Sequence, residues 1–170
     1  MNSLNKNLIG FWLYIFTDCI MFSIIFISFL LSNNFLLKKI IFNYKILLIE
    51  SILLLYCSYL SIIIINKNKN KYYYLNILFS TLFLILEYKD YYHLKILNIT
   101  FTNNNYLSNY FLIIFFHALH VFISIIICIN LFYIKYLNKK IKIINICYSL
   151  FWHFIHIIWL CLVLIIYLKK

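Results

Sequence analysis

Five long apolar runs constrain this chain more than any other feature of its sequence. They cover about residues 9–31, 46–65, 72–88, 110–134 and 143–168. A helix of twenty residues is about 30 Å long, which matches the hydrocarbon core of a bilayer. The runs do not alternate between apolar and polar residues with period two, as the strands of a membrane barrel would. We therefore predict an all-α integral membrane protein with five transmembrane helices in one domain over residues 1–170.

The composition points to lipid rather than water as the natural solvent. Of the 170 residues, 66% are hydrophobic and 11% are charged, a share that a soluble domain of this size could not bury. The net charge of +11 comes from fifteen lysines. They lie in the gaps between apolar runs, so anionic lipid headgroups are the expected partner and nucleic acid is not. The preference for Ile, Asn, Lys, Tyr and Phe indicates a genome rich in A and T.

The first run carries an acid, Asp18, near its middle, and the only glycine of the chain, Gly10. An acid at that depth costs about 2.5–3.5 kcal/mol on insertion scales, so we expect Asp18 to pair with a polar group on a neighbouring helix. Burial in lipid favours its protonated form. The run is too long for a signal peptide, contains an acid and lacks a small-residue cleavage site, so we expect it to stay in the mature protein.

Polar residues recur on one side of every run, because spacings of three, four and seven place them on one helix face. The residues concerned are Asp18; Glu50 and Ser61; Ser80, Glu87 and Asp90; His117, His120 and Ser124; and Ser149, His153 and His156. This pattern predicts helices packed against other helices. A polar contact of Glu87 with His117 or His153 is the pairing that we expect between helices.

The histidines admit a metal interpretation. His117 with His120, and His153 with His156, form two HxxH pairs that could hold haem or a divalent ion. The alternative is that these histidines and the acids bond to one another and to backbone across helix interfaces. Acids within the membrane would also suit a small transporter, although no proline and no second glycine mark broken helices.

The cysteines show no metal or disulfide pattern. All five lie inside or at the edge of apolar runs, and no CxxC spacing occurs: Cys19, Cys57, Cys128, Cys147 and Cys161. We interpret them as small fillers buried in the membrane.

Five segments in order carry a family resemblance. They are GFWLYIFTDCIMF (10–22), LIESILLLYCS (48–58), LEYKDYYHL (86–94), FHALHV (116–121) and SLFWHFIHIIWLCLVLIIYL (149–168). Together they resemble subunit III of the haem–copper oxidases, and more narrowly that of the cytochrome o (bo-type) ubiquinol oxidase. The resemblance touches all five runs, whereas the loops match poorly. The Asp18–Cys19 pair and Glu50 favour the quinol branch, and the alternative is subunit III of a cytochrome c or menaquinol oxidase.

The chain departs from the family pattern at four positions. Phe116 and Ala118 stand where the family usually has glycines, so helix contact must be repacked there. His156 stands where the family generally has Asp, so an acid–histidine contact that is available to relatives is missing here. Asp90 matches a family Glu that is one carbon longer.

The resemblance implies a non-catalytic subunit that packs on subunit I, stabilises it and supports proton pumping and lipid binding. Haem and copper would belong to subunit I, so no residue of this chain is expected to be catalytic or to bind metal or cofactor. The implied partners are subunits I, II and IV, bound phospholipid, and the ubiquinol that the complex uses. The implied location is the bacterial inner membrane with a cytoplasmic N-terminus. The lysines lean the same way, with eight on the N-terminal side against seven opposite.

Overall fold

The computed structural model describes residues 3–32, 44–67, 69–96, 105–137 and 142–168. These residues form five helices, and each covers one of the predicted runs, which confirms the all-α class. The helices are α1 (Ser3–Leu31), α3 (Tyr44–Lys67), α4 (Asn70–Ile96), α5 (Asn105–Tyr136) and α6 (Lys142–Leu168). Six of the lysines used to argue orientation lie outside the described residues, at positions 38, 39, 139, 140, 169 and 170.

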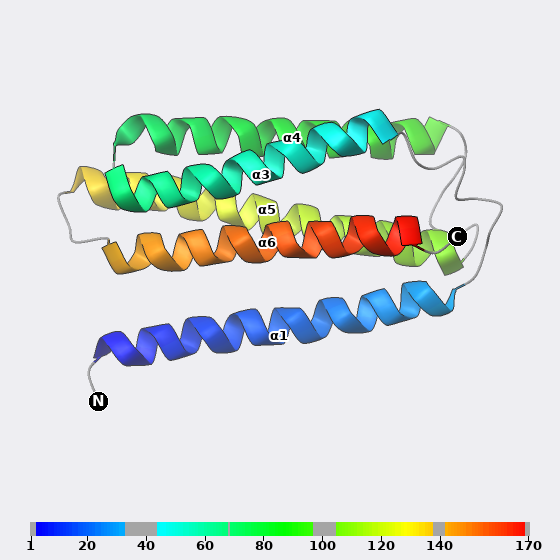
Figure 1. Ribbon diagram of the computed structural model, residues 1–170, viewed down its shortest axis with the longest axis horizontal. Coiled ribbons are helices and arrows are strands. Elements are labelled where there is room, and N and C mark those ends of the chain that lie inside the picture. The colour runs from blue at the N-terminus through cyan, green and yellow to red at the C-terminus, as the bar shows by residue number, and fades with distance from the viewer. Residues whose placement is uncertain (1–2, 33–43, 68, 97–104, 138–141, 169–170) are drawn as a thin grey trace.

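The helices run alternately up and down, so the two termini lie at opposite ends of the molecule (Figure 1). Helices α3, α4, α5 and α6 form a four-helix bundle, because α3 and α5 each pack against both α4 and α6. Helix α1 lies outside this bundle and packs against α5 and α6 (Figure 1). Any polar contact that joins α1 to the rest of the chain must therefore come from these two helices.

Hydroxyl side chains lie within apolar helices because they bond to their own backbone. Ser51 donates to the Leu47 carbonyl at 2.8 Å, and Ser80 donates to the Asn76 carbonyl at 2.7 Å. Bonds of this kind satisfy the hydroxyl one turn back along the helix, so no second helix is needed.

The core of the bundle is rich in aromatic rings. Tyr73, Phe83 and Trp152 are each 0% exposed, and the Phe83 ring meets the Trp159 ring edge-on with centroids 5.3 Å apart. Helix α1 contributes less, since only 11% of its apolar span Leu8–Leu31 is buried, against 50% for the span in α6. Most of the α1 surface therefore faces away from the chain.

Four of the five helices are long and apolar enough to cross a membrane: Leu8–Leu31, Ile46–Lys67, Asn105–Tyr136 and Ile143–Ile165. The prediction of five transmembrane helices therefore goes further than the structure does. Helix α4 is the exception, since it carries three lysines and two acids among its 27 residues. Its buried face also includes the polar residues Asn76, Ser80 and Glu87.

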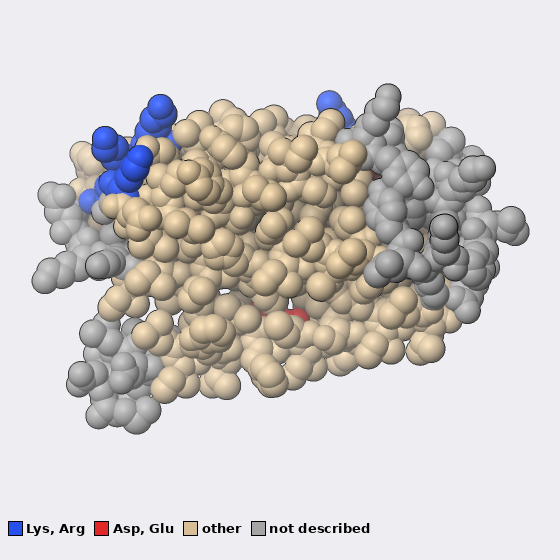
Figure 2. Space-filling model, in the orientation of Figure 1, with Lys and Arg blue, Asp and Glu red and all other residues tan. Residues whose placement is uncertain are grey.

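Charged side chains gather toward the ends of the molecule rather than along its flank. Lys67, Lys69 and Lys71 are exposed where α3 ends and α4 begins, and lysine side chains gather at that end in Figure 2. On the face shown, most of the flank between the ends is uncharged, apart from basic atoms at its upper edge and acid atoms visible between α1 and the helices above it. This distribution suits a protein whose flank is in lipid.

Candidate functional site

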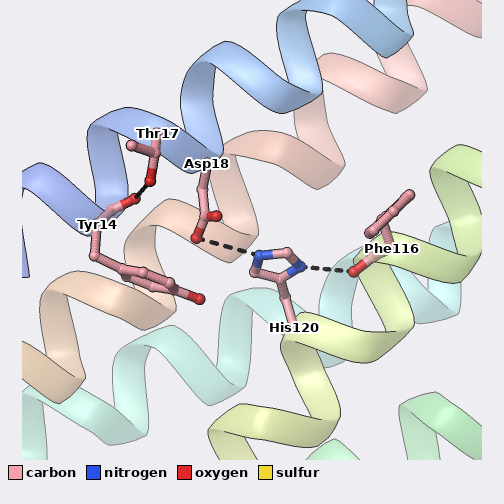
Figure 3. A network of polar contacts seen from close by, with 5 residues as sticks. All are labelled: Tyr14, Thr17, Asp18, Phe116 and His120. Carbon is pink, nitrogen blue, oxygen red and sulfur yellow. Dashed lines mark hydrogen bonds and ion pairs between the residues drawn. The ribbon is translucent and has the colours of Figure 1, made fainter.

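Asp18 of α1 meets His120 of α5. The His120 Nε2 atom lies 3.3 Å from the Asp18 Oδ2 atom, and the His120 Nδ1 atom lies 2.7 Å from the Phe116 carbonyl oxygen (Figure 3). The side chain of His120 is 5% exposed and that of Asp18 is 14% exposed. The sequence predicted a polar partner for this acid on a neighbouring helix, and the structure identifies it as His120.

The protons of this pair can be placed from the geometry. A carbonyl oxygen only accepts hydrogen bonds, so the Nδ1 atom of His120 must carry a proton. One further proton then lies between the Nε2 atom and the carboxyl group of Asp18. The pair has a net charge of zero whether that proton is on the acid or on the ring. This neutrality lowers the cost of placing both groups within a membrane.

Aromatic rings enclose the pair on the bundle side. The Phe22 ring lies 5.2 Å from the His120 ring, and the Phe151 ring lies 6.3 Å from it. Phe22 is on α1 and Phe151 is on α6, so all three helices that meet here contribute to the site. Such shielding from water strengthens the electrostatic attraction within the pair.

Three other acids approach one another near the end of the bundle where α3 begins and α4 ends. Glu87 interacts electrostatically with both Glu50 and Asp90. Glu50 is 4% exposed and Glu87 is 7% exposed, whereas Asp90 is half-buried. Among the described residues, no hydrogen-bond partner reaches either carboxylate oxygen of Glu87 or the Oε1 atom of Glu50.

His117 is fully buried but does not join this acidic group. Its ring lies between Phe83, with centroids 5.7 Å apart, and Trp159, at 5.1 Å. Neither of its ring nitrogens has a hydrogen-bond partner in the described part of the chain. The expected bond between Glu87 and His117 is therefore not formed, because aromatic rings occupy the space around the imidazole.

His153 and His156 lie half-buried on α6. They interact electrostatically with each other, and neither forms a hydrogen bond with any described residue. Within the described ranges, no three His, Cys, Asp or Glu side chains come together in a group that could hold a metal ion. The two HxxH pairs are thus not brought together into one site.

Sequence reasoning missed several polar contacts inside the bundle. Asn145 of α6 and the Tyr73 hydroxyl of α4 bond to each other, with Asn145 Nδ2 donating at 3.1 Å. The Trp159 Nε1 atom of α6 donates to the Ser51 hydroxyl of α3 at 3.0 Å. Asparagine and tyrosine are so common in this chain that these residues did not stand out. Their positions within apolar runs were the available signal.

A cavity of about 480 Å³ opens between α4 and α5. Its lining is mainly apolar and aromatic: Leu84, Glu87, Tyr88, Tyr91, Phe111, Ile114, Phe115 and Ala118. Ala118 is one of the departures from the family pattern and lines this cavity. Phe116, which also stands where the family usually has a glycine, is half-buried and packs its ring against Phe115, with centroids 6.0 Å apart.

The cysteines are all free. Cys57 and Cys128 are buried, Cys147 and Cys161 are partly buried, and Cys19 is exposed. Cys19 is exposed because α1 turns that side away from the bundle, and the burial of all five cysteines in the membrane stays a prediction.

Comparison with known proteins places the chain in a family. A scan against protein-family models found no match. The chain is 34% identical to cytochrome bo(3) ubiquinol oxidase subunit 3 of Buchnera aphidicola subsp. Schizaphis graminum, over 97% of this chain and 95% of that protein. It is 33% identical to the subunit 3 of Buchnera aphidicola subsp. Acyrthosiphon pisum, over 96% of this chain and 87% of that protein. It is 26% identical to the subunit 3 of Pseudomonas aeruginosa, over 96% of this chain and 85% of that protein. The resemblance found in the sequence motifs is confirmed, and the chain belongs to the cytochrome bo(3) ubiquinol oxidase subunit 3 family.

Proposed function

We propose that this chain is the non-catalytic subunit III of a proton-pumping terminal ubiquinol oxidase. The observation that carries the proposal is the extent of the similarity, which covers 97% of the chain and 95% of a relative with that subunit's name. The similarity therefore extends over all the helices and their buried polar residues and is not limited to one motif. In this role the chain packs on subunit I, stabilises it and supports proton pumping.

The polar groups of the chain suit a structural role. Asp18 and His120 bond to each other and thereby tie α1 to the bundle. His117 is enclosed by the rings of Phe83 and Trp159. Groups that are occupied or enclosed in this way are poorly placed to meet a substrate. We assign the haem and copper of the complex to subunit I, and none to this chain.

Helix α4 is the fifth membrane crossing in this proposal. It packs along both α3 and α5, which are themselves candidate spans. Its lysines lie toward its two ends, at Lys71 and at Lys89 and Lys95, and the polar residues Asn76 and Ser80 between them face the interior. Five crossings place the termini on opposite sides of a bacterial inner membrane, with the N-terminus in the cytoplasm.

The partners in this proposal are oxidase subunits I, II and IV and membrane phospholipid. The cavity between α4 and α5 is our candidate for a bound lipid chain, since its volume of about 480 Å³ lies within the range of ligand pockets. Ubiquinol is the electron donor to the complex rather than a ligand of this chain.

The proposal is tested by comparing the oxidase purified with and without this chain. We expect the same haem absorption and the same initial rate of quinol oxidation from both preparations. Without the chain, the rate should decay faster during turnover, and fewer protons should be pumped per electron. If haem absorption is lost when the chain is removed, or if the isolated chain itself shows haem absorption, the non-catalytic role is contradicted and the HxxH pairs are favoured as ligands. A complex that oxidises cytochrome c or menaquinol instead would move the chain to another branch of the family.

A further inference from the structure

Two histidines of α6 lie close to the middle of its apolar span. The apolar span of this helix is Ile143–Ile165, so residue 154 is its midpoint. His153 and His156 are one residue before and two residues after that point. At about 1.5 Å of rise per residue, the backbone positions of both histidines lie within roughly 3 Å of the middle of this span.

His153 lies on the outward face of α6. Residues four, seven and eleven positions later share its face, and these are Ile157, Leu160 and Leu164. Their exposed fractions are 58%, 42% and 53%. The residues that point into the bundle are different ones, including Trp152 and Ile155, which are 0% exposed, and Trp159, at 3%. His156 lies at the edge of the same outward face, toward α3.

The described part of the chain does not satisfy these imidazoles. Neither forms a hydrogen bond with a described residue, whereas His120 bonds to both Asp18 and a backbone carbonyl. A neutral imidazole has one N–H donor and one acceptor nitrogen. Lipid tails supply neither partner. Polar side chains at mid-depth of membrane helices therefore face protein or a water-filled cavity and are paired there.

We propose that the outward face of α6, defined by His153, His156, Ile157, Leu160 and Leu164, docks a transmembrane helix of another subunit of the oxidase. The docked helix presents a hydrogen-bond acceptor at mid-depth, either a carboxylate or a hydroxyl, that receives the imidazole N–H. The leucine and isoleucine side chains then pack around this polar contact. The inference rests on the proposed function, which supplies the complex, and adds the face through which the chain enters it.

The first test is photo-cross-linking within the intact complex. A photoreactive phenylalanine analogue replaces Leu160 in one variant and, as the control, Ile85 of α4 in another; Ile85 is 51% exposed. We expect the position 160 variant to form an adduct with another oxidase subunit, in higher yield than the position 85 variant. If the complex copurifies but position 160 forms an adduct only with lipid, or with a second copy of this chain, the docking face is overturned and the proposed function stands. Failure of the chain to copurify with any oxidase subunit would overturn the proposed function and the docking face with it.

The second test distinguishes lipid contact from protein contact by whether the subunit is retained in the complex. The double variant His153→Leu, His156→Leu removes two polar groups from an outward face. If that face met lipid, the variant subunit would be as well retained in the complex as the natural one. We expect its retention during detergent purification to weaken by about tenfold, since two intramembrane hydrogen bonds are lost. The control His93→Leu, at an exposed site beyond the acidic group of α4, should leave retention unchanged. Unchanged retention of the double variant would overturn the proposal.

Discussion

The Nε2 atom of His120 lies 3.3 Å from the Oδ2 atom of Asp18, and this pair joins α1 to the four-helix bundle near the middle of α1. The other nitrogen of the same ring is held by the Phe116 carbonyl, so the orientation of the imidazole is set by its own helix. The acid of the first helix is thus met by a ring that is already in position. This arrangement makes several substitutions informative.

Replacing Asp18 by Asn should be nearly harmless. The amide of Asn can donate to the Nε2 atom of a neutral His120, because the single ring proton is then on the Nδ1 atom and is directed to the Phe116 carbonyl. We expect Asp18→Asn to assemble and to oxidise quinol at close to the natural rate, whereas Asp18→Leu should lower the free energy of unfolding by about 1–3 kcal/mol. Thermal unfolding in detergent and oxygen consumption measure the two effects. An assembled Asp18→Asn complex that has lost turnover would show that the acid itself takes part in proton transfer.

His117 and His120 should respond in opposite ways to substitution by Leu. His117 has no hydrogen-bond partner in the described structure and is surrounded by aromatic rings, so His117→Leu should be neutral or stabilising. His120→Leu removes the partner of Asp18 and should be destabilising by about 1–3 kcal/mol. The midpoint temperatures of unfolding of the two variants provide the comparison. Similar losses in both would mean that His117 has a partner outside this chain.

The Tyr73–Asn145 contact between α4 and α6 should show measurable coupling. A double-mutant cycle with Tyr73→Phe and Asn145→Leu isolates the energy of this buried pair. We expect a coupling of about 0.6 kcal/mol, and no more than about 1.7 kcal/mol, as measured for hydrogen bonds between membrane helices. Tyr74→Phe is the matched control, since Tyr74 is 59% exposed. Additive effects of the two substitutions would indicate that the bond does not stabilise the fold.

The two ends of α4 should lie on opposite sides of the membrane. Lys69 and Lys95 are both exposed and flank the polar helix whose crossing we propose. In a background without the native cysteines, Lys69→Cys should react with an impermeant thiol reagent only from the cytoplasm, and Lys95→Cys only from the periplasm. Reaction of both from one side would exclude a crossing by α4 and leave four spans.

The sequence predicts the helices well because long apolar runs have few other structures available to them in lipid. It predicts α4 less well, since its apolar run is shorter than the helix, which extends to Ile96 with Asp90 and Lys95 in its final turns. A hydropathy pattern marks the part of a helix that suits lipid, whereas the helix itself continues for as long as its backbone bonds are favourable.

The partners of the polar residues are harder to predict. Periodicity correctly placed Asp18 toward another helix but could not select His120 over His117, because the choice depends on the rotation and depth of α5. The expected contact of Glu87 with His117 fails for the same reason, since Phe83 and Trp159 take the positions around that ring. Pairings of this kind are set by helix packing, which a single sequence does not encode in any local pattern.

Affinity purification is the sharpest test of whether this chain is a structural subunit of a ubiquinol oxidase. The chain is tagged, and the proteins that it retains in mild detergent are identified and examined for haem absorption and ubiquinol oxidation. We predict that subunit I copurifies with the chain, that its haem absorption is seen, and that the preparation oxidises ubiquinol. Purification of the chain without subunit I, from membranes in which subunit I is present, would contradict this prediction.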